Sequence, residues 1–226
     1  MVACHMTPGG MAHEMRGSPS ESETGASGDC PLGSLIRANP RPTNFERRCE
    51  LADGIATIIR SIRGTDCTAC SAMFSACSPK SLYCRYERVV SKSPEQLAAE
   101  LCSPNTDCEC TLVGEIIIDS VPTIVGIAQL ITDPAHQVAE YAVLIADAWQ
   151  NKGLGSALTD ASLELAAEWG VPRFVAEFLP SNMRLIRILS KRRFDLSRDF
   201  RENVVSGEKR ITGREEAPTA PSCASN

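Results

Sequence analysis

The sequence lacks any excess of positive charge. Its 226 residues include 23 Lys and Arg against 28 Asp and Glu, which leaves a formal net charge of −5 at pH 7. Nucleic acids and anionic membrane surfaces attract basic proteins without regard to sequence, and an acidic chain forgoes that attraction. We therefore expect no nucleic acid and no membrane among the partners of this protein.

Long hydrophobic runs are missing as well. No segment reaches the roughly 18 consecutive apolar residues of a membrane-spanning helix. Residues 1–50 also lack the apolar core of a secretory signal, and polar and charged residues follow the twin arginines Arg47 and Arg48. These absences predict a cytoplasmic protein.

Cysteine is plentiful, but its spacing does not predict a disulfide framework. Eleven cysteines make up about 5% of the chain, below the density of a disulfide scaffold. The spacing Cys67-x-x-Cys70 is that of zinc ligands, yet no second such pair and no histidine lies nearby. Cys77 and Cys84 continue the pattern at helical intervals, which favours small buried side chains on one helix face. We expect no metal site and, without a paired histidine, no nucleophilic cysteine.

The two ends of the chain differ in composition from its middle. Residues 1–50 are rich in Gly, Ser, Pro and Met, and the chain ends in the polar stretch GREEAPTAPSCASN. Such segments bury too little apolar surface to offset the entropy that is lost on ordering. We expect disordered tails at 1–50 and 206–226 around one domain at 51–205.

Within this domain, the hydrophobic spacing changes between the periods of strands and helices. Residues 111–120 and 123–133 are β-branched runs parted by a turn signal, which predicts a hairpin. Ser93 and Gln96 have the spacing of a capping box and predict a helix at 93–102. Further strands are expected at 55–63, 138–147, 173–180 and 194–200, and further helices at 67–77, 154–169 and 181–193.

The second half of the domain has the order strand, helix, strand. A crossover helix makes neighbouring strands run parallel, whereas a hairpin joins antiparallel strands. The sequence therefore predicts an α/β domain with a mixed, mostly antiparallel central sheet flanked by helices.

The stretch WQNKGLGSAL, residues 149–158, places two glycines between an expected strand and an expected helix. Glycine lets the backbone approach a ligand closely, and a helix N-terminus offers unpaired N–H groups to an anion. A Walker A loop is excluded because Lys152 precedes Gly153, and a dinucleotide-binding loop is disfavoured because Leu158 replaces its third glycine. Two possibilities remain. The loop binds another phosphate-bearing ligand, or it is a glycine turn without any ligand.

The pattern Gln150-x-x-Gly153-x-Gly155, between a strand and a long helix, resembles the pyrophosphate-binding loop of the GNAT acyltransferases. The resemblance covers residues 53–196 approximately. The segments SPKSLYCRYE, AEYAVLIADAWQNKGLGSAL and LPSNMRLIRILSKRRF are similar to the Pat-type protein lysine acetyltransferases of that superfamily. This resemblance implies the GNAT fold, with acetyl-CoA as the co-substrate and no metal.

The resemblance also implies a site. Glu140 corresponds to the general base, and Val138, Ala142 and Leu144 on the same strand face would desolvate it, which makes a carboxylate a better proton acceptor. A solvent-facing glutamate at the start of a strand is the alternative. The residues matched to the pantetheine arm, the thioester and the pyrophosphate of the cofactor are Val143, Leu144, Ile145, Gln150, Asn151, Lys152, Gly153, Leu154, Gly155, Ser156 and Asn182.

Two positions depart from the pattern of the family. Leu189 stands where many GNAT enzymes carry a tyrosine that protonates the leaving thiolate, and Arg193 replaces a glycine in the following turn. We therefore expect no tyrosine acid, and a non-glycine residue at 193 resists a positive φ. Arg184, Arg187 and Lys191 share one helix face, which fits either a solvated surface or attraction of an anion.

The resemblance implies direct transfer of an acetyl group from acetyl-CoA to an amine, with a protein lysine as the first choice of acceptor. A small-molecule amine is an alternative acceptor. A non-catalytic acyl-CoA-binding sensor is a further alternative because the tyrosine is missing, although Glu140 favours an enzyme.

Overall fold

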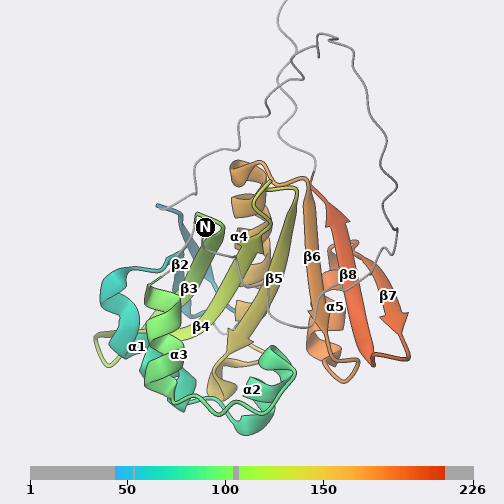
Figure 1. The fold of residues 1–226 in the computed structure, drawn as a ribbon. Helices are drawn as coiled ribbons and strands as arrows, with labels where there is room; N and C mark the ends of the chain where they lie inside the picture. The colour runs from blue at the N-terminus through green and yellow to red at the C-terminus, as the bar shows by residue number, and fades with distance from the viewer. Residues whose placement is uncertain (1–43, 53, 104–106, 212–226) are drawn as a thin grey trace, which may run out of the picture.

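The computed structural model describes residues 44–52, 54–103 and 107–211, and Figure 1 shows its ribbon. Within these residues, eight strands form one sheet in the order β1-β2-β3-β4-β5-β6-β8-β7. The neighbours β5 and β6 are parallel, and the other neighbouring pairs are antiparallel. The predicted fold class is thus confirmed. The strands are β1 (Glu46–Glu50), β2 (Ala56–Ser61), β3 (Glu109–Ile118), β4 (Val121–Thr132), β5 (Val138–Ile145), β6 (Arg173–Phe178), β7 (Asp195–Asp199) and β8 (Val204–Arg210).

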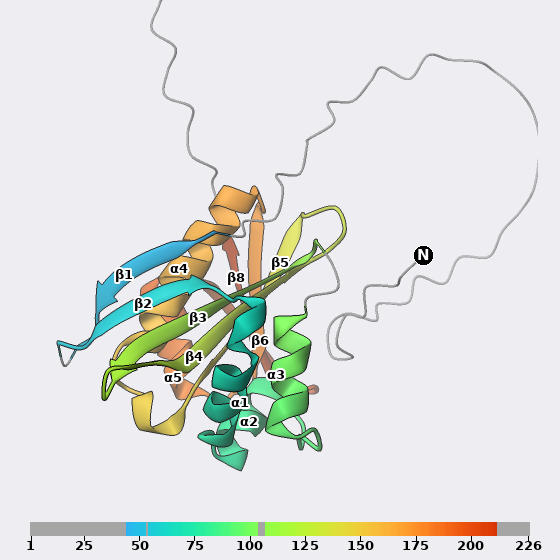
Figure 2. The same ribbon diagram turned by 90° about the vertical axis from the view of Figure 1, so that its left-hand side faces the viewer.

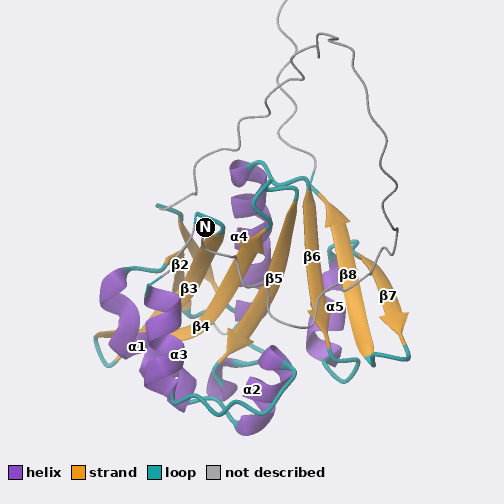
Figure 3. Ribbon diagram, viewed as in Figure 1, coloured by secondary structure: helices purple, strands orange, loops and turns teal. Residues whose placement is uncertain are grey.

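Helices cover both faces of the sheet, as Figures 2 and 3 show. One face carries α4 and α5, and its core includes Leu158, Leu165 and Trp169. The opposite face carries α1, α2 and α3, with Met73 and Phe74 in its core. The helices are α1 (Cys67–Ser75), α2 (Pro79–Tyr86), α3 (Pro94–Cys102), α4 (Leu154–Trp169) and α5 (Met183–Lys191), with short 3-10 turns η1 (Gly64–Asp66) and η2 (Asp147–Trp149).

Local signals in the sequence account for several of these boundaries. β3 and β4 are joined by Asp119 and Ser120, whose φ values of 49° and 66° make the two-residue turn that twisted hairpins favour. The capping box of α3 forms as predicted, with Gln96 N–H donating to Ser93 Oγ (3.3 Å) and Ser93 N–H donating to Gln96 Oε1 (2.9 Å). α4 ends where Gly170 takes a φ of 81°.

Two strands lie outside the predicted set. β1 falls in the stretch expected as an N-terminal tail, and β8 runs past residue 205, so the fold extends beyond both expected boundaries. Both strands have short, largely polar sequences, and their order comes from pairing with β2 and β6 rather than from a hydrophobic pattern of their own. The rest of the expected tails lies outside the described residues.

Three of the four cysteines expected on one helix face fall on two different helices, and Cys77 lies between these helices. Cys67 and Cys70 lie in α1, which ends before Cys77, and Cys84 lies in α2. α2 begins at Pro79, which has no N–H to continue a preceding helix. The helical spacing of these cysteines therefore does not reflect one continuous helix.

A pair of glycines in the sheet receives the first residue of α4. Gly114 on β3 and Gly126 on β4 are in register. A Cβ on Gly114 would lie 2.8 Å from Leu154 Cδ1, and a Cβ on Gly126 would lie 3.0 Å from Leu154 Cδ2 and 2.6 Å from Ile145 Cδ1. Side chains at these positions would clash, so the two glycines leave a hollow that seats Leu154. The N-terminal end of α4 is thereby pressed against the sheet beside the end of β5.

No helix within residues 44–211, as far as these are described, has both the length and the apolar character needed to cross a membrane.

We expect Gly126→Ala to lower the free energy of unfolding by about 1–3 kcal/mol, because a methyl group overfills this hollow. The carbonyl oxygen of Leu144, 3.3 Å from the new Cβ, limits relaxation. Gly64→Ala is the control, since no atom lies within 4 Å of its Cβ. Urea unfolding of both variants measures the difference, and equal effects would contradict the packing described for Gly126.

Candidate functional site

The sheet opens between its two parallel strands. β5 and β6 pair only from Val138 and Arg173 to Glu140 and Val175. β5 continues to Ile145, and β6 also continues beyond its last pair. Figure 1 shows the two strands diverging toward their carboxyl ends. A gap edged by two strands therefore begins directly after Glu140.

Backbone groups of β5 line this gap. The N–H of Ala146 donates to the carbonyl of Val125 on β4 (3.0 Å), and in an antiparallel ladder every second residue bonds to the same neighbour. Leu144 therefore also bonds to β4, whereas Val143 and Ile145 direct their N–H groups toward β6. Because β6 has diverged there, these two amides have no strand partner among the described residues and can bind an extended ligand in place of a strand.

A set of side chains joins the loop after β5 to α2 and α5. Gln150 Nε2 donates to the carbonyl of Ile145 (3.0 Å) and to Ser81 Oγ on α2 (3.0 Å). Arg184 on α5 donates from NH1 to Gln150 Oε1 (2.6 Å) and from Nε to Asn151 Oδ1 (2.9 Å). We call Ser81, Gln150, Asn151 and Arg184 the loop clasp. The loop clasp fixes the conformation of the loop from both sides. It also gives a structural role to Arg184, one of the three basic residues on α5.

Asp147 extends the loop clasp to the N-terminus of α2. Its Oδ1 accepts from Ser81 Oγ (2.7 Å) and from the N–H of Ser78 (3.3 Å). Burial alone would raise the pKa of Asp147, but these hydrogen bonds outweigh it and hold the pKa below its ordinary value. The carboxylate is therefore an ionised structural group.

The start of α4 is an open helix N-terminus. Its N-cap is Gly153, which has a φ of 96° and no side chain to cap the helix. The first intrahelical bond of the helix runs from Ala157 N–H to the carbonyl of Gly153 (3.0 Å). The N–H groups of Leu154, Gly155 and Ser156 thus lack intrahelical acceptors and lie at the positive end of the helix dipole. Three converging amides suit a diphosphate.

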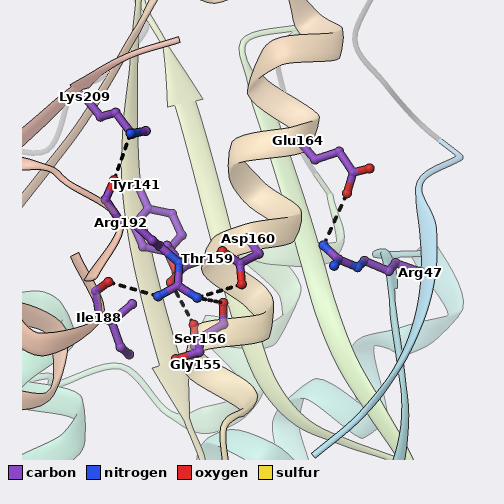
Figure 4. Close-up of polar contacts among 10 residues, drawn as sticks. All are labelled: Arg47, Tyr141, Gly155, Ser156, Thr159, Asp160, Glu164, Ile188, Arg192 and Lys209. Atoms are coloured by element: carbon purple, nitrogen blue, oxygen red, sulfur yellow. Dashed lines mark hydrogen bonds and ion pairs between the residues drawn. The ribbon is translucent and has the colours of Figure 1, made fainter. Parts of the chain in front are cut away.

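The first turn of α4 is also held from its carbonyl side, as Figure 4 shows. Thr159 Oγ1 donates to the carbonyl of Gly155 (2.7 Å) and pairs with Tyr141 Oη of β5 (2.8 Å). Arg192, after α5, donates to the carbonyl of Ser156 (2.8 Å) and to both oxygens of Asp160 (2.6 and 2.7 Å). The residues that orient this turn therefore come from β5 and from the end of α5.

Three glutamates gather around the gap. Glu140 lies on β5, Glu177 lies on β6 two residues past the last pair, and Glu87 follows α2 with a φ of 54°. All three are half-buried. Burial raises the pKa of Glu87 and of Glu177, and the charge of Glu140 raises both further. Glu87 likewise raises the pKa of Glu177, so the charges of these carboxylates act on one another at short range, and we call the three residues the acidic trio.

Arg85 supplies a positive charge beside the acidic trio. Its NH2 donates to Gln129 Oε1 on β4 (2.7 Å), and its guanidinium lies 4.9 Å from the centre of the Tyr86 ring. Its Nε is buried and has no hydrogen-bond partner in the described part of the chain. Burial lowers the pKa of Arg85, while the nearby Tyr86 and the charge of Glu140 act in the opposite direction.

The structure separates some of the residues that the sequence grouped together. Leu144 points into the core under α1 and α3, and its backbone belongs to the ladder with β4. Asn182 is the N-cap of α5, since its Oδ1 accepts from Leu185 N–H (3.2 Å). The side chain of Leu154 fills the hollow between Gly114 and Gly126, so that only its backbone faces the loop.

Sequence reasoning did not single out Glu177, Arg85 or Arg192. Glu177 sits in an ordinary alternating strand pattern, and its position matters only because β6 leaves β5. Arg192 lies at a helix end, where a solvated arginine is the usual case, and its partner Asp160 is far away in sequence. Within the described residues, no group of three or more His, Cys, Asp or Glu side chains could hold a metal ion.

Comparison with known proteins agrees with this geometry. The profile of the Acetyltransferase (GNAT) family matches residues 80–194, which is just over half of the chain. The chain belongs to the GNAT family. It is therefore an N-acetyltransferase that takes its acetyl group from acetyl-CoA, and the recognition made from the glycine loop is confirmed.

Solved GNAT structures share the whole domain. The GNAT domain of S. lividans PAT is 26% identical, with a TM-score of 0.63 over 74% of this chain and 97% of that one. The putative acetyltransferase yncA from Salmonella typhimurium, solved with its cofactor acetyl-CoA, is 20% identical, with a TM-score of 0.54 over 73% of this chain and 99% of that one. The ribosomal-protein-S5-alanine acetyltransferase from Vibrio fischeri is 14% identical, with a TM-score of 0.59 over 74% and 97%. At these identities the last two show the fold alone.

The turn after α5 holds Arg193 in a left-handed conformation, which glycine adopts without strain. Arg193 adopts a φ of 57°, which costs roughly 1–2 kcal/mol for a residue with a Cβ. The preceding Leu189 is fully buried in the core, so it takes no part in proton transfer. The two departures in sequence therefore place a buried leucine and a left-handed arginine at the end of α5.

We expect Glu177→Gln to raise the free energy of unfolding at pH 7 by roughly 0.5 kcal/mol. The folded state raises the pKa of Glu177, so ionising this carboxyl above its unfolded pKa of about 4.3 costs stability, and glutamine removes that cost. Below about pH 4 the carboxyl is protonated in both states and the gain disappears. Urea unfolding at pH 7 and below about pH 4 measures the gain in the free energy of unfolding. An equal gain at both pH values would contradict the raised pKa.

Glu208→Gln on the neighbouring strand is the matched control for this measurement. Glu208 Oε1 pairs with Arg173 Nε (2.9 Å), and hydrogen bonding to that guanidinium lowers the pKa of Glu208. Its replacement should give no gain at pH 7.

Proposed function

We propose that this GNAT enzyme binds acetyl-CoA along the open edge of β5 and transfers the acetyl group directly to an amine, with Glu140 as the general base. The observation that carries the proposal is the half-buried Glu140 at the last β5–β6 pair, next to the two free amides of the gap. Among the described residues, no side chain donates a hydrogen bond to its carboxylate, and the positive charge of Arg85 acts on it. An unoccupied carboxylate at this position can accept a proton from an incoming amine.

The cofactor roles follow the arrangement of free backbone groups. In this proposal the diphosphate lies on the N–H groups of Leu154, Gly155 and Ser156, and the pantetheine arm runs along β5 beside Val143 and Ile145. The N–H of Val143 would polarise the thioester carbonyl and stabilise the oxyanion that forms during attack. The other members of the loop, Gln150, Asn151 and Lys152, would act by shaping it, as the loop clasp suggests for the first two. Asn182 would act indirectly by capping α5.

The chemistry needs few groups. An amine must lose a proton to become a nucleophile, and Glu140 would take it directly or through one water molecule. The neutral nitrogen then attacks the thioester carbon, and the tetrahedral intermediate expels the thiolate of coenzyme A. With Leu189 in the position of the family tyrosine, the thiolate would take its proton from solvent.

We propose a protein lysine as the acceptor, and the resemblance to the Pat-type enzymes is one reason. A second is electrostatic, because the acidic trio favours a cationic ammonium group. A third is spatial, because no helix of the described chain covers the front faces of β6, β8 and β7 in Figure 1. A small cationic amine shares the electrostatic reason and is the second candidate, which an acceptor screen with peptides and free amines would separate.

We propose that residues 51–205, extended by β1 and by the end of β8, are the catalytic unit. We also propose a cytoplasmic location, where acetyl-CoA is available.

Gly155→Glu tests the cofactor site. A carboxylate on the first turn of α4 would repel the diphosphate, and we expect the affinity for acetyl-CoA to fall at least tenfold in calorimetric titration of the full chain. Gly155→Ala is the matched control, because its Cβ would meet only the flexible end of Ile188 at 3.2 Å and Ile145 at 4.0 Å. Unchanged binding in the folded Gly155→Glu variant would refute this site.

Glu140→Gln tests the base. We expect kcat to fall about 10²–10⁴-fold while the affinity for coenzyme A stays the same, because glutamine keeps the shape but accepts no proton. Glu164→Gln on the outer face of α4, where Glu164 pairs with Arg47, should keep full activity. Activity is measured by release of the coenzyme A thiol with a lysine-containing peptide. A Glu140→Gln enzyme with normal kcat would rule out this residue as the base.

A further inference from the structure

α1 and α3 lie side by side on the sheet, as Figures 1 and 2 both show. Two contacts fix their relative direction. Ser71 Oγ of α1 donates to Glu95 Oε1 in the first turn of α3 (3.3 Å), and Cys67 Sγ, one turn earlier on α1, donates to the carbonyl of Ala98, further along α3 (4.0 Å). The helices are therefore antiparallel, and the start of α1 lies beside the end of α3.

This direction brings a third cysteine to the Cys67-x-x-Cys70 pair. Cys102 follows Ala98 by one turn on α3, and the side chain of a helical residue leans back over the preceding turn. The thiol of Cys102 thus reaches the sulfur of Cys67, which already contacts the Ala98 carbonyl. Burial raises the pKa of Cys102, and hydrogen-bonding contacts with the thiols of Cys67 and Cys70 raise it further. We call these three residues the thiol cluster.

The members of the thiol cluster differ in accessibility. Cys67 and Cys102 are half-buried, whereas Cys70 is 0% exposed. Burial raises the pKa of Cys70 to about 11, and it also raises the pKa of Cys102, so Cys67 is the member of the cluster that is left to act as the nucleophile. The cluster does not form a metal site within the described residues. Two accessible thiols in contact, on different helices, are instead the arrangement that oxidises to a disulfide.

We propose that Cys67 and Cys102 are an oxidation site, at which a peroxide converts the two thiols to an intramolecular disulfide. The thiolate of Cys67 attacks a peroxide oxygen, forming a sulfenic acid and releasing one molecule of water after protonation. The second thiol then attacks the sulfenic sulfur, and the S–S bond forms with loss of a second water. Two thiols and one hydrogen peroxide thus give one disulfide and two waters.

The bond would tie together the segment that carries α2. Residues 68–101 form the closed loop, and this loop includes Ser81 of the loop clasp and Arg85 beside the acidic trio. Cross-linking its two ends restrains the unfolded chain and holds α1 against α3. The oxidised protein should therefore be harder to unfold.

The experiment treats the reduced full chain with a small excess of hydrogen peroxide and blocks the remaining thiols with an alkylating reagent. Digestion with trypsin and a glutamate-specific protease isolates residues 64–80 from residues 101–109. Mass spectrometry without reduction should find these peptides joined, with the loss of two hydrogens, and separated by dithiothreitol. The unfolding temperature should rise by about 5 °C on oxidation and return on reduction.

Variants assign the bond. Cys67→Ser and Cys102→Ser should each abolish both the joined peptides and the rise in unfolding temperature. Cys70→Ser tests the shielded thiol, and Cys84→Ser on α2 is the control. Both variants should keep the joined peptides and the rise in unfolding temperature. The proposal is overturned if the peptides stay separate after peroxide treatment, or if they remain joined in either Cys67→Ser or Cys102→Ser.

Discussion

The seating of Leu154 between Gly114 and Gly126 is the contact on which the rest of the site depends. An open helix N-terminus binds an anion only if its amides stand at a defined place relative to the reacting groups. The bare backbone of two paired glycines lets the first residue of α4 pack against β3 and β4, where an added Cβ would force the side chain of Leu154 to shift. The three free amides are thereby held next to the end of β5, whose own amides face the same gap.

The gap between β5 and β6 lowers the stability of the fold, and nearby side chains offset part of this loss. Separating two parallel strands leaves backbone groups without partners, and unpaired buried groups are expensive. One of them, the carbonyl of Ile145, is satisfied by Gln150, and that side chain is held in turn by Arg184. In our proposal the amides of Val143 and Ile145 bind the cofactor. The glutamine that opens the GNAT loop pattern thus has a clear structural task here, because it satisfies a carbonyl at the edge of the gap.

The sequence predicted those parts of the molecule that depend on local chemistry. The capping box at Ser93, the hairpin at Asp119 and Ser120, and the glycines at 153 and 155 each carry their reason within a few residues. Other parts depend on distant partners. β1 is ordered by β2, Arg192 reaches Asp160 across 32 residues, and Glu177 matters because of where β6 leaves β5. Such facts are set by the path of the chain through space, and no periodicity in the sequence expresses them.

α2 connects features that the sequence keeps apart. Its first turn anchors Asp147 and Gln150 of the loop after β5 through Ser78 and Ser81, while its last turn places Arg85 beside the acidic trio, to which Glu87 belongs. A shift of this short helix would therefore change both this loop and the electrostatics around Glu140. None of its residues is fully buried, so packing alone holds it weakly, and polar contacts must fix its position. The thiol cluster lies at the two ends of the segment that contains α2, so a covalent bond there would restrain an element that has no fully buried residue and that borders the proposed active site.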